Sequence, residues 1–189
     1  MKESLKDRKV PKLNWVFDWA ETIIVALLLA LVIRAFFLQV FWIPSESMLP
    51  GLAISDRIAV NKVIYHFRPP QRFDIVVFRS VPEISVDKKD LIKRLIGLPG
   101  EKLELKKGVV YINDKPLAET HPLNNEYNNL SDMPATFGPI TIPNDRYFVM
   151  GDNRPNSYDS RYWQSLPKRN LIGQAFLLIW PLNKIGLIR

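Results

Sequence analysis

The stretch Ile43-Pro44-Ser45-Glu46-Ser47-Met48-Leu49-Pro50-Gly51 divides the chain into two parts of different character. A long apolar segment precedes it, and the residues after it have the alternating pattern of β-strands. The two prolines and the glycine restrict the backbone on both sides of the serines. Most such loops only connect two parts of a chain, but two hydroxyls on a stiff turn are also typical of a nucleophile and its helper.

The segment before this turn predicts a membrane anchor. Residues 1–14 form a solvated basic tail, and residues 15–42 are mainly apolar, with no charge between Thr22 and Ile33. About 20 such residues cross a bilayer as a helix, and the charged side chains near the ends can snorkel. Because the basic tail comes first, we expect a cytoplasmic N-terminus and an extracytoplasmic part from residue 43 onward.

A cleavable signal peptide is the alternative explanation of this segment, because Ser45-x-Ser47 resembles a small-x-small cleavage site. However, the apolar region is longer than those of signal peptides, and cleavage would detach the serine turn from its support. We therefore expect an uncleaved anchor.

Composition narrows the possible partners and cofactors. The 189 residues suit one domain with a small appendage, and there are no cysteines and only two histidines. Disulfides and thiolate metal ligands are excluded, and we expect neither a metal nor another cofactor. The net charge of +7 comes from basic residues scattered among acidic ones, without a recognised nucleic-acid motif. We expect membrane lipid, rather than nucleic acid, to be the partner.

The residues after the turn predict a mostly β fold with one N-terminal transmembrane helix. We expect residues 43–189 to form one β domain, in which about residues 102–145 make a smaller β subdomain. Residues 119–138 indicate a polar surface loop. Strands are predicted at Arg57–Tyr65, Asp74–Arg79, Asp90–Leu98, Lys102–Lys106, Val109–Ile112, Arg146–Met150 and Gly173–Trp180.

A serine nucleophile needs a base within hydrogen-bond reach. In an extended segment Ser45 and Ser47 share one side. His66 and His121 have no carboxylate neighbour at a suggestive spacing, and we expect both at the surface. Strand alternation places Lys93 among apolar neighbours, which disfavour its ammonium form. Lys93 is thus either the base or an edge-strand lysine that prevents aggregation.

A third stretch, residues 150–163, crowds charges and hydroxyls into a loop after a predicted strand, which suggests a loop fixed by ion pairs. The motif Ser-x-x-Lys is absent because Pro50 follows Ser47 by three, which argues against a penicillin-binding or β-lactamase site.

Together these stretches resemble the bacterial type I signal peptidases, which are membrane-anchored serine proteases with a Ser/Lys dyad. The single short anchor is similar to the cyanobacterial or Gram-positive kind. The resemblance covers most of the chain and lies in Pro44-Ser45-x-Ser47-Met48-x-Pro50, Asp56 to Val60, Phe73 to Phe78, Ile92-Lys93-Arg94-x-Ile96-Gly97-Leu98-Pro99-Gly100, and Gly151-Asp152-Asn153-Arg154 through Ser157-x-Asp159-Ser160-Arg161.

The resemblance implies a role for each of these residues. Ser47 is expected to be the nucleophile and Lys93 the general base, with an oxyanion hole formed by Ser45 Oγ and the Ser47 backbone N–H. Ser157 is expected to hydrogen-bond the lysine and orient it. Two ion pairs are expected to fix the loop, namely Asp159 with Arg161 and Asp152 with Arg94.

The resemblance also implies substrate pockets for small residues one and three places before the cut. Preprotein signal peptides are expected to bind as an extended strand, beside the translocation machinery at the plasma membrane, or at the thylakoid membrane if the source is cyanobacterial. The pocket residues are expected to be Phe41, Ile43, Pro44, Leu52, Ile58, Val77, Leu91 and Ile92.

The chain departs from the family pattern at five positions. Gly51 stands where Thr is frequent, Ser55 and Phe73 where Gly is frequent, Leu91 where an aromatic is frequent, and Gln164 where Gly often follows Trp. Two other classes of protein remain possible: a membrane-tethered β module without activity, and a Ser/Lys autoprotease. The autoprotease class requires an internal Ala-Gly cleavage loop, which is not found.

Overall fold

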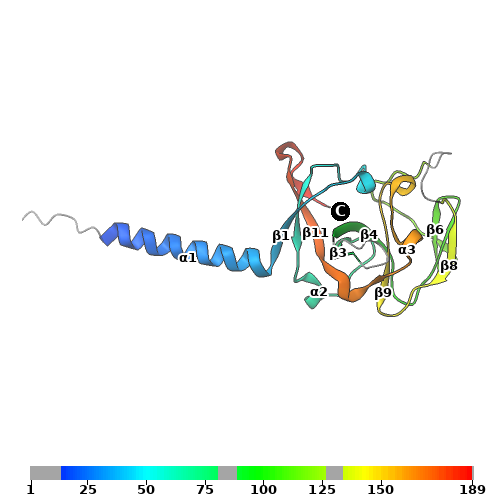
Figure 1. The fold of residues 1–189 in the computed structure, drawn as a ribbon, viewed down its shortest axis with the longest axis horizontal. Coiled ribbons are helices and arrows are strands. Elements are labelled where there is room, and N and C mark those ends of the chain that lie inside the picture. Colours follow the sequence, from blue (N-terminus) through cyan, green and yellow to red (C-terminus); the bar gives the residue numbers. More distant parts are fainter. Residues whose placement is uncertain (1–13, 81–88, 127–133, 189) are drawn as a thin grey trace, which may run out of the picture. The chain divides into compact units, whose positions relative to one another are not determined.

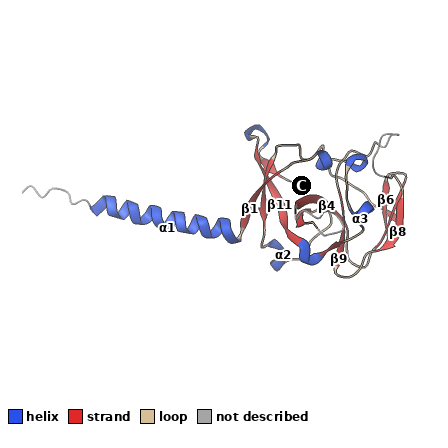
Figure 2. Cartoon of the chain, viewed as in Figure 1, coloured by secondary structure: helices blue, strands red, loops and turns tan. Residues whose placement is uncertain are grey.

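The computed structural model describes residues 14–80, 89–126 and 134–188 (Figure 1). The chain divides into two compact units, residues 1–37 and residues 38–189. The first contains a helix and the second contains the β-strands (Figure 2). The mostly β fold predicted from the sequence is confirmed for the second unit.

The N-terminal unit contains the helix α1, Asn14–Phe36. Its large apolar side chains are exposed, from 41% at Ile33 to 66% at Phe17. In the part of the chain that the structure describes, no helix combines the length and the apolar character needed to cross a membrane.

The helix is shorter than the anchor predicted over residues 15–42. It ends at Phe36, and Leu38–Trp42 forms strand β1. These five residues pair in antiparallel register with β2, so that Leu38 faces Asn61 and Trp42 faces Arg57. The prediction was wrong here because an apolar stretch rich in aromatic and β-branched residues suits a strand as well as a helix, and only a distant partner strand decides between them.

The larger sheet has eight antiparallel strands, and it carries the serine turn at one end and the lysine near its middle. Its order is β1-β2-β11-β3-β4-β9-β10, with β12 beside β11. The bounds of the strands after β1 are Arg57–Asn61 (β2), Ile75–Arg79 (β3), Asp90–Gly97 (β4), Arg146–Met150 (β9), Leu166–Pro167 (β10), Leu171–Trp180 (β11) and Gly186–Leu187 (β12).

The smaller sheet has four antiparallel strands in the order β7-β6-β5-β8. All of them come from the middle of the chain, where the sequence suggested a subdomain over about residues 102–145. Their bounds are Lys102–Lys106 (β5), Val109–Ile112 (β6), Lys115–Pro116 (β7) and Phe137–Thr141 (β8).

Short helices connect the strands of the second unit. The strand predicted over Arg57–Tyr65 is too long, because β2 ends at Asn61 and α2 follows. Asn61 Oδ1 accepts hydrogen bonds from the backbone N–H groups of Val63 and Ile64, which favours a turn at this point. The short helices are α2 (Ile64–Phe67), α3 (Ser160–Trp163), η1 (Glu46–Met48), η2 (Arg154–Asn156), η3 (Lys168–Asn170) and η4 (Leu182–Lys184).

One buried apolar cluster packs against the serine turn. Ile43 and Met48, at the two ends of the turn, are buried in it together with residues of β2, β3 and β11. Because both ends are held in the core, the hydroxyls between them are fixed in position.

Candidate active site

The serine turn is a 3-10 turn rather than the extended segment that we expected. Ser45 has an extended backbone, and η1 begins at the next residue. The backbone N–H groups of Leu49 and Leu52 donate to the carbonyls of Glu46 and Met48, at 3.0 and 2.9 Å. The hydroxyl oxygens of Ser45 and Ser47 nevertheless lie 3.3 Å apart.

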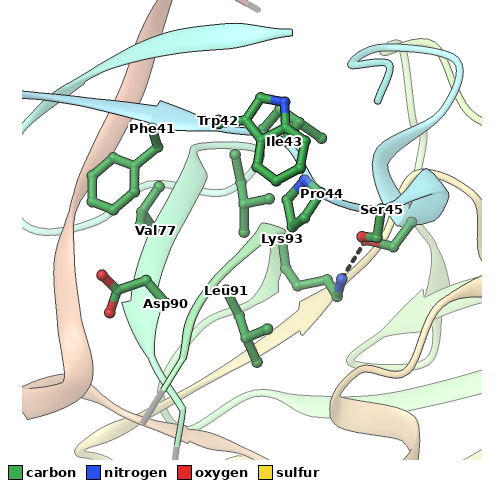
Figure 3. A pocket seen from close by; sticks show the side chains of 11 residues that line it. Phe41, Trp42, Ile43, Pro44, Ser45, Val77, Asp90, Leu91 and Lys93 are labelled. Carbon is green, nitrogen blue, oxygen red and sulfur yellow. Dashed lines mark hydrogen bonds between the residues drawn. The ribbon is translucent and has the colours of Figure 1, made fainter. Parts of the chain in front are cut away.

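Lys93 meets Ser47 inside the protein. Its side chain leaves the middle of β4 and points toward the serine turn (Figure 3), where its Nζ lies 2.5 Å from Ser47 Oγ in a hydrogen bond. Lys93 is 5% exposed and Ser47 is 7% exposed. Burial lowers the pKa of Lys93 to about 8, with a smaller contribution from the positive charge of Arg161, and the carboxylates of Asp159 and Asp152 oppose this shift.

The neighbouring residue on β4, Arg94, forms a buried ion pair with Asp152. Its Nε and Nη2 donate to the two carboxylate oxygens at 2.8 and 2.7 Å, and its Nη1 donates to the carbonyl of Phe73. Burial raises the pKa of Asp152, and the Arg94 guanidinium opposes that rise. The pair ties β4 to the loop after β9, so it fixes the distance between the lysine strand and that loop.

The second expected ion pair, between Asp159 and Arg161, is also present and buried. Arg161 Nε and Nη2 donate to the carboxylate at 2.9 and 2.8 Å. The same carboxylate accepts from the backbone N–H of Gly151, and Arg161 also donates to the carbonyl of Arg154. Asp159 therefore joins the start of α3 to the end of β9.

Ser157 differs from its expected role. Its side chain is buried, but its Oγ has no hydrogen-bond partner in the structure, so the predicted bond to Lys93 is absent. Instead Ser157 packs against Gly151. A Cβ at Gly151 would lie closer than 3.0 Å both to Ser157 Oγ and to the carbonyl oxygen of Ser47. The loop thus comes as close to the serine turn as a glycine allows.

Asn153 is a site residue to which the sequence analysis assigned no role. Its backbone N–H donates to the carbonyl of Ser47 at 3.1 Å, and its side-chain amide donates to the carbonyl of Glu46 at 3.2 Å. Asn153 therefore holds the backbone of the nucleophile. Its place inside the third motif was the available signal, but the acceptors lie more than 100 residues away in the sequence.

Asn153 is held in turn by the segment 119–126. Asn124 forms a bridge with it and donates from its side chain to Asn153 Oδ1 at 3.1 Å. The Asn124 backbone also bonds to Asp152 and Arg154, and Arg154 forms a bidentate pair with Glu119. The described part of the predicted surface loop is therefore partly packed against the site.

His121 contradicts the expectation of a surface residue, whereas His66 is exposed. The side chain of His121 is 4% exposed and lies between Glu119 and Asp152, with carboxylate oxygens at 3.5 and 3.7 Å, beside the ring of Phe73. Burial lowers its pKa to about 3, assisted by the charges of Arg94 and Arg154. Packing of segment 119–126 against the site encloses it.

A small pocket of about 40 Å³ opens beside the serine and the lysine (Figure 3). Six of the predicted pocket residues line it: Phe41, Ile43, Pro44, Val77, Leu91 and Ile92. Trp42 and Asp90 also line it and were not predicted. Leu52 and Ile58 are not among the residues that line this pocket; both are buried in the apolar cluster beneath the serine turn, and their contact with substrate stays a prediction.

A serine hydroxyl bonded to a buried lysine amine defines a class of enzyme. In serine peptidases the nucleophile is activated by an adjacent base, and lysine takes that place in some of them. No cluster of histidine and carboxylate side chains able to hold a metal occurs in residues 14–80, 89–126 and 134–188. The site brings together a hydroxyl and an amine that can act chemically as nucleophile and base.

Comparison with known proteins identifies the family. Residues 16–180 match the family described as signal peptidase, peptidase S26. The chain is 39% identical to a probable signal peptidase I-2 from Synechocystis, covering 100% of this chain and 84% of the relative. It is 43% identical to a signal peptidase I from Leptolyngbya laminosa, covering 90% and 83%. The chain belongs to the signal peptidase family, and it is therefore a peptidase.

Among solved structures, the chain is similar to a signal peptidase I from Enterococcus faecalis. The sequence identity is 36% and the TM-score is 0.45, over 57% of this chain and 97% of the other.

Proposed function

We propose that this protein is a membrane-anchored serine endopeptidase that removes N-terminal signal peptides from exported preproteins after small-x-small sequences. The observation that carries the proposal is the 2.5 Å hydrogen bond between Lys93 Nζ and Ser47 Oγ in a buried site. The family of the chain and the names of its relatives support this substrate class.

In the proposed mechanism Ser47 is the nucleophile and Lys93 the general base. The neutral amine accepts the hydroxyl proton while Ser47 Oγ attacks the carbonyl carbon of the scissile bond. The ammonium then gives the proton to the leaving amine, and the signal peptide stays attached to Ser47 as an ester. A water molecule, activated by the same lysine, hydrolyses the ester and releases the signal peptide.

The lowered pKa makes lysine effective in this role. At pH 7, a lysine with an ordinary pKa near 10.4 is neutral in only about one molecule in 2,500. A pKa of about 8 raises the neutral fraction to about one in ten, by the same relation. Burial therefore increases the population of the neutral amine about two-hundredfold.

Ser45 and the backbone of Ser47 are proposed to form the oxyanion hole. The hydroxyl of Ser45 lies 3.3 Å from Ser47 Oγ. When Ser47 Oγ attacks the scissile carbonyl, negative charge develops on the carbonyl oxygen of the substrate, and the hydroxyl of Ser45 is close enough to donate a hydrogen bond to it. Preorganised donors of this kind commonly contribute about 10²- to 10³-fold in rate. The two ion pairs and Asn153 keep the donors and the nucleophile in register.

The edge of β4 supports binding of the substrate as an added strand. On one side, residues 90–94 of β4 pair with β3. On the other side, β9 pairs with β4 only from Arg94 to Gly97. Among the described residues, no strand covers residues 90–93 on this second side. An extended peptide can form main-chain hydrogen bonds there, beside the catalytic lysine.

The small pocket accounts for the proposed preference for small residues before the cut. Its volume of about 40 Å³ is a few times the roughly 10–15 Å³ that one water molecule needs on the same measure. A methyl group fits such a space, whereas a larger side chain would need its walls to move.

We further propose that the N-terminal unit holds the protein at a membrane, with a cytoplasmic N-terminus. The exposed apolar side chains of α1 support contact with lipid, and the basic tail favours the cytoplasmic side. The second unit would then act on the extracytoplasmic side, near the translocation machinery from which preproteins emerge.

The test is hydrolysis of a preprotein by the detergent-solubilised full chain, with Ser47→Ala and Lys93→Met as variants. We expect the parent to cut after the small-x-small sequence and both variants to lose at least about 10³-fold in kcat/KM, because nucleophile and base act as a unit. Phe67→Ala, at an exposed position on α2, is the control for expression and folding. Variants that cleave as well as the parent would refute the dyad.

A further inference from the structure

A second hollow shares the serine and the lysine with the small pocket but has a different outer lining. Both hollows are bordered by Ser45, Ser47, Leu91 and Lys93. The small pocket extends along β1 and Val77. The second hollow is completed instead by polar and aromatic side chains from the serine turn, the start of β4 and the loop after β9, namely Glu46, Lys89, Asn156 and Tyr158. The two hollows therefore meet at the reacting atoms and diverge from them.

The two hollows differ greatly in size. The second has a volume of about 350 Å³, against about 40 Å³ for the small pocket. It can hold whole side chains of any size together with their backbone. One side of the dyad thus selects strongly by size, and the other does not.

Tyr158 gives the second hollow a rigid aromatic wall. Its neighbours in sequence, Ser157 and Asp159, are both buried, so the backbone on each side is fixed. Its ring contacts that of Tyr162 on α3, with the ring centroids 4.4 Å apart. Both rings are exposed, by 43% and 66%. Rigid, exposed aromatic side chains contribute strongly to binding because they lose little conformational freedom.

The chemistry of the site suggests what occupies this hollow. In the proposed reaction the residues before the cut occupy the small pocket, while Lys93 must reach the nitrogen of the leaving group. The chain beyond the cut therefore has to depart from Lys93 along the other hollow. We propose that this hollow binds the first residues of the mature protein, and that Tyr158 makes it favour large or planar side chains there; this rests on the proposed function.

Two substrates with the same small-x-small sequence test this inference on the full chain. One has a tryptophan directly after the cut and the other has a glycine at that position, and both continue as the same peptide. We expect Tyr158→Ala to lower the ratio of the two kcat/KM values, tryptophan over glycine, about five- to tenfold, the range of a single aromatic contact. Tyr158→Phe should restore the ratio because the ring is kept. Phe67→Ala, which removes an exposed aromatic from α2, should leave it unchanged.

The outcomes separate this inference from the proposed function. If Tyr158→Ala lowers both kcat/KM values equally, the side chain supports the loop rather than the leaving group, and the inference is wrong. The inference is also wrong if the parent cuts a peptide with tryptophan after the cut no faster than one with glycine there, and if Tyr158→Ala also cuts these two peptides at equal rates. If the parent cuts neither substrate, the proposed function itself fails.

Discussion

In the proposed mechanism Lys93 works only in its uncharged form, and its surroundings favour that form. The buried amine is 2.5 Å from the hydroxyl of Ser47. Carboxylates nearby hold its pKa at about 8 rather than lower. If Asp152 and Asp159 were not each paired with an arginine, their charges would stabilise the ammonium more strongly and reduce the neutral fraction.

The pH dependence of activity follows from this pKa. Below pH 8 the amine is mostly protonated and cannot accept the serine proton, so kcat/KM should rise about tenfold per pH unit in this range. Above pH 8 it should level off because the amine is already neutral. Steady-state hydrolysis of a peptide between pH 6 and 10 measures this profile. A flat profile over the whole range would exclude lysine as the base.

Among the elements, several turns carry side chains in backbone conformations that suit glycine. Ser55, Phe73 and Gln164 have φ values of 70°, 73° and 69°. All three stand where the resemblance to signal peptidases indicated glycine as the frequent residue. Gln164 is the most strained, because its ψ of −128° places it in a region that side chains rarely adopt. This strain lies at the end of α3, which presents Tyr162.

Replacing Gln164 by glycine should therefore stabilise the protein. We expect Gln164→Gly to raise the free energy of unfolding by about 1–3 kcal/mol, less the entropy that glycine gains in the unfolded chain. Urea denaturation of parent and variant measures the difference. Gln164→Ala is the matched control, since it keeps the Cβ and should show no such gain. A variant less stable than the parent would mean that the glutamine side chain has an unrecognised stabilising role.

Local pattern was sufficient to predict the strands of the second unit that alternate clearly. Five predicted strands agree with the structure to within one residue at each end: those around Ile75–Arg79, Asp90–Gly97, Lys102–Lys106, Val109–Ile112 and Arg146–Met150. Strand β1 was missed because its identity depends on pairing with β2. The roles of Asn153 and segment 119–126 were missed because hydrogen bonds between distant loops leave no periodic signal in the sequence.

Ser47 and Lys93 each have a local signature, a stiff turn and an apolar flank, but only the resemblance to the signal peptidases predicted them as nucleophile and base. The pocket was only partly predictable. Leu52 and Ile58 belong to the same buried cluster as the lining residue Ile43, but they do not line the pocket. Sequence position does not tell which side of a sheet faces a cavity when both sides are covered.

At the scale of the whole molecule, stability depends on a histidine that stays neutral when folded. The pKa of His121 is lowered from 6.5 to about 3. As the pH falls below 6.5, the unfolded chain takes up a proton that the folded protein does not bind. Protonation therefore favours unfolding in this window, and stability should fall by up to about 1.4 kcal/mol per pH unit. Above pH 6.5 this contribution is fully present and constant.

The measurement is urea denaturation at pH 7.5 and pH 5.0. We expect the loss of stability between these values to be smaller in His121→Gln than in the parent by about 1–2 kcal/mol, the integrated linkage of one such group. His66→Gln is the matched control, because His66 is exposed on α2. If both variants lose as much stability as the parent, His121 is protonated equally in the folded and unfolded states.

The groups that hold the serine turn in place also determine at what stage of synthesis the proposed active site can form. A ribosome synthesises Ser47 early, but Asn153, which holds its backbone, comes much later, and so does β11, which pairs with β2 beside the strand that leads to Ser47. A nascent chain that ends before these residues carries both reacting side chains without the geometry that aligns them. Proteolytic activity should therefore appear only when synthesis is nearly complete, so the growing polypeptide is protected from its own active site.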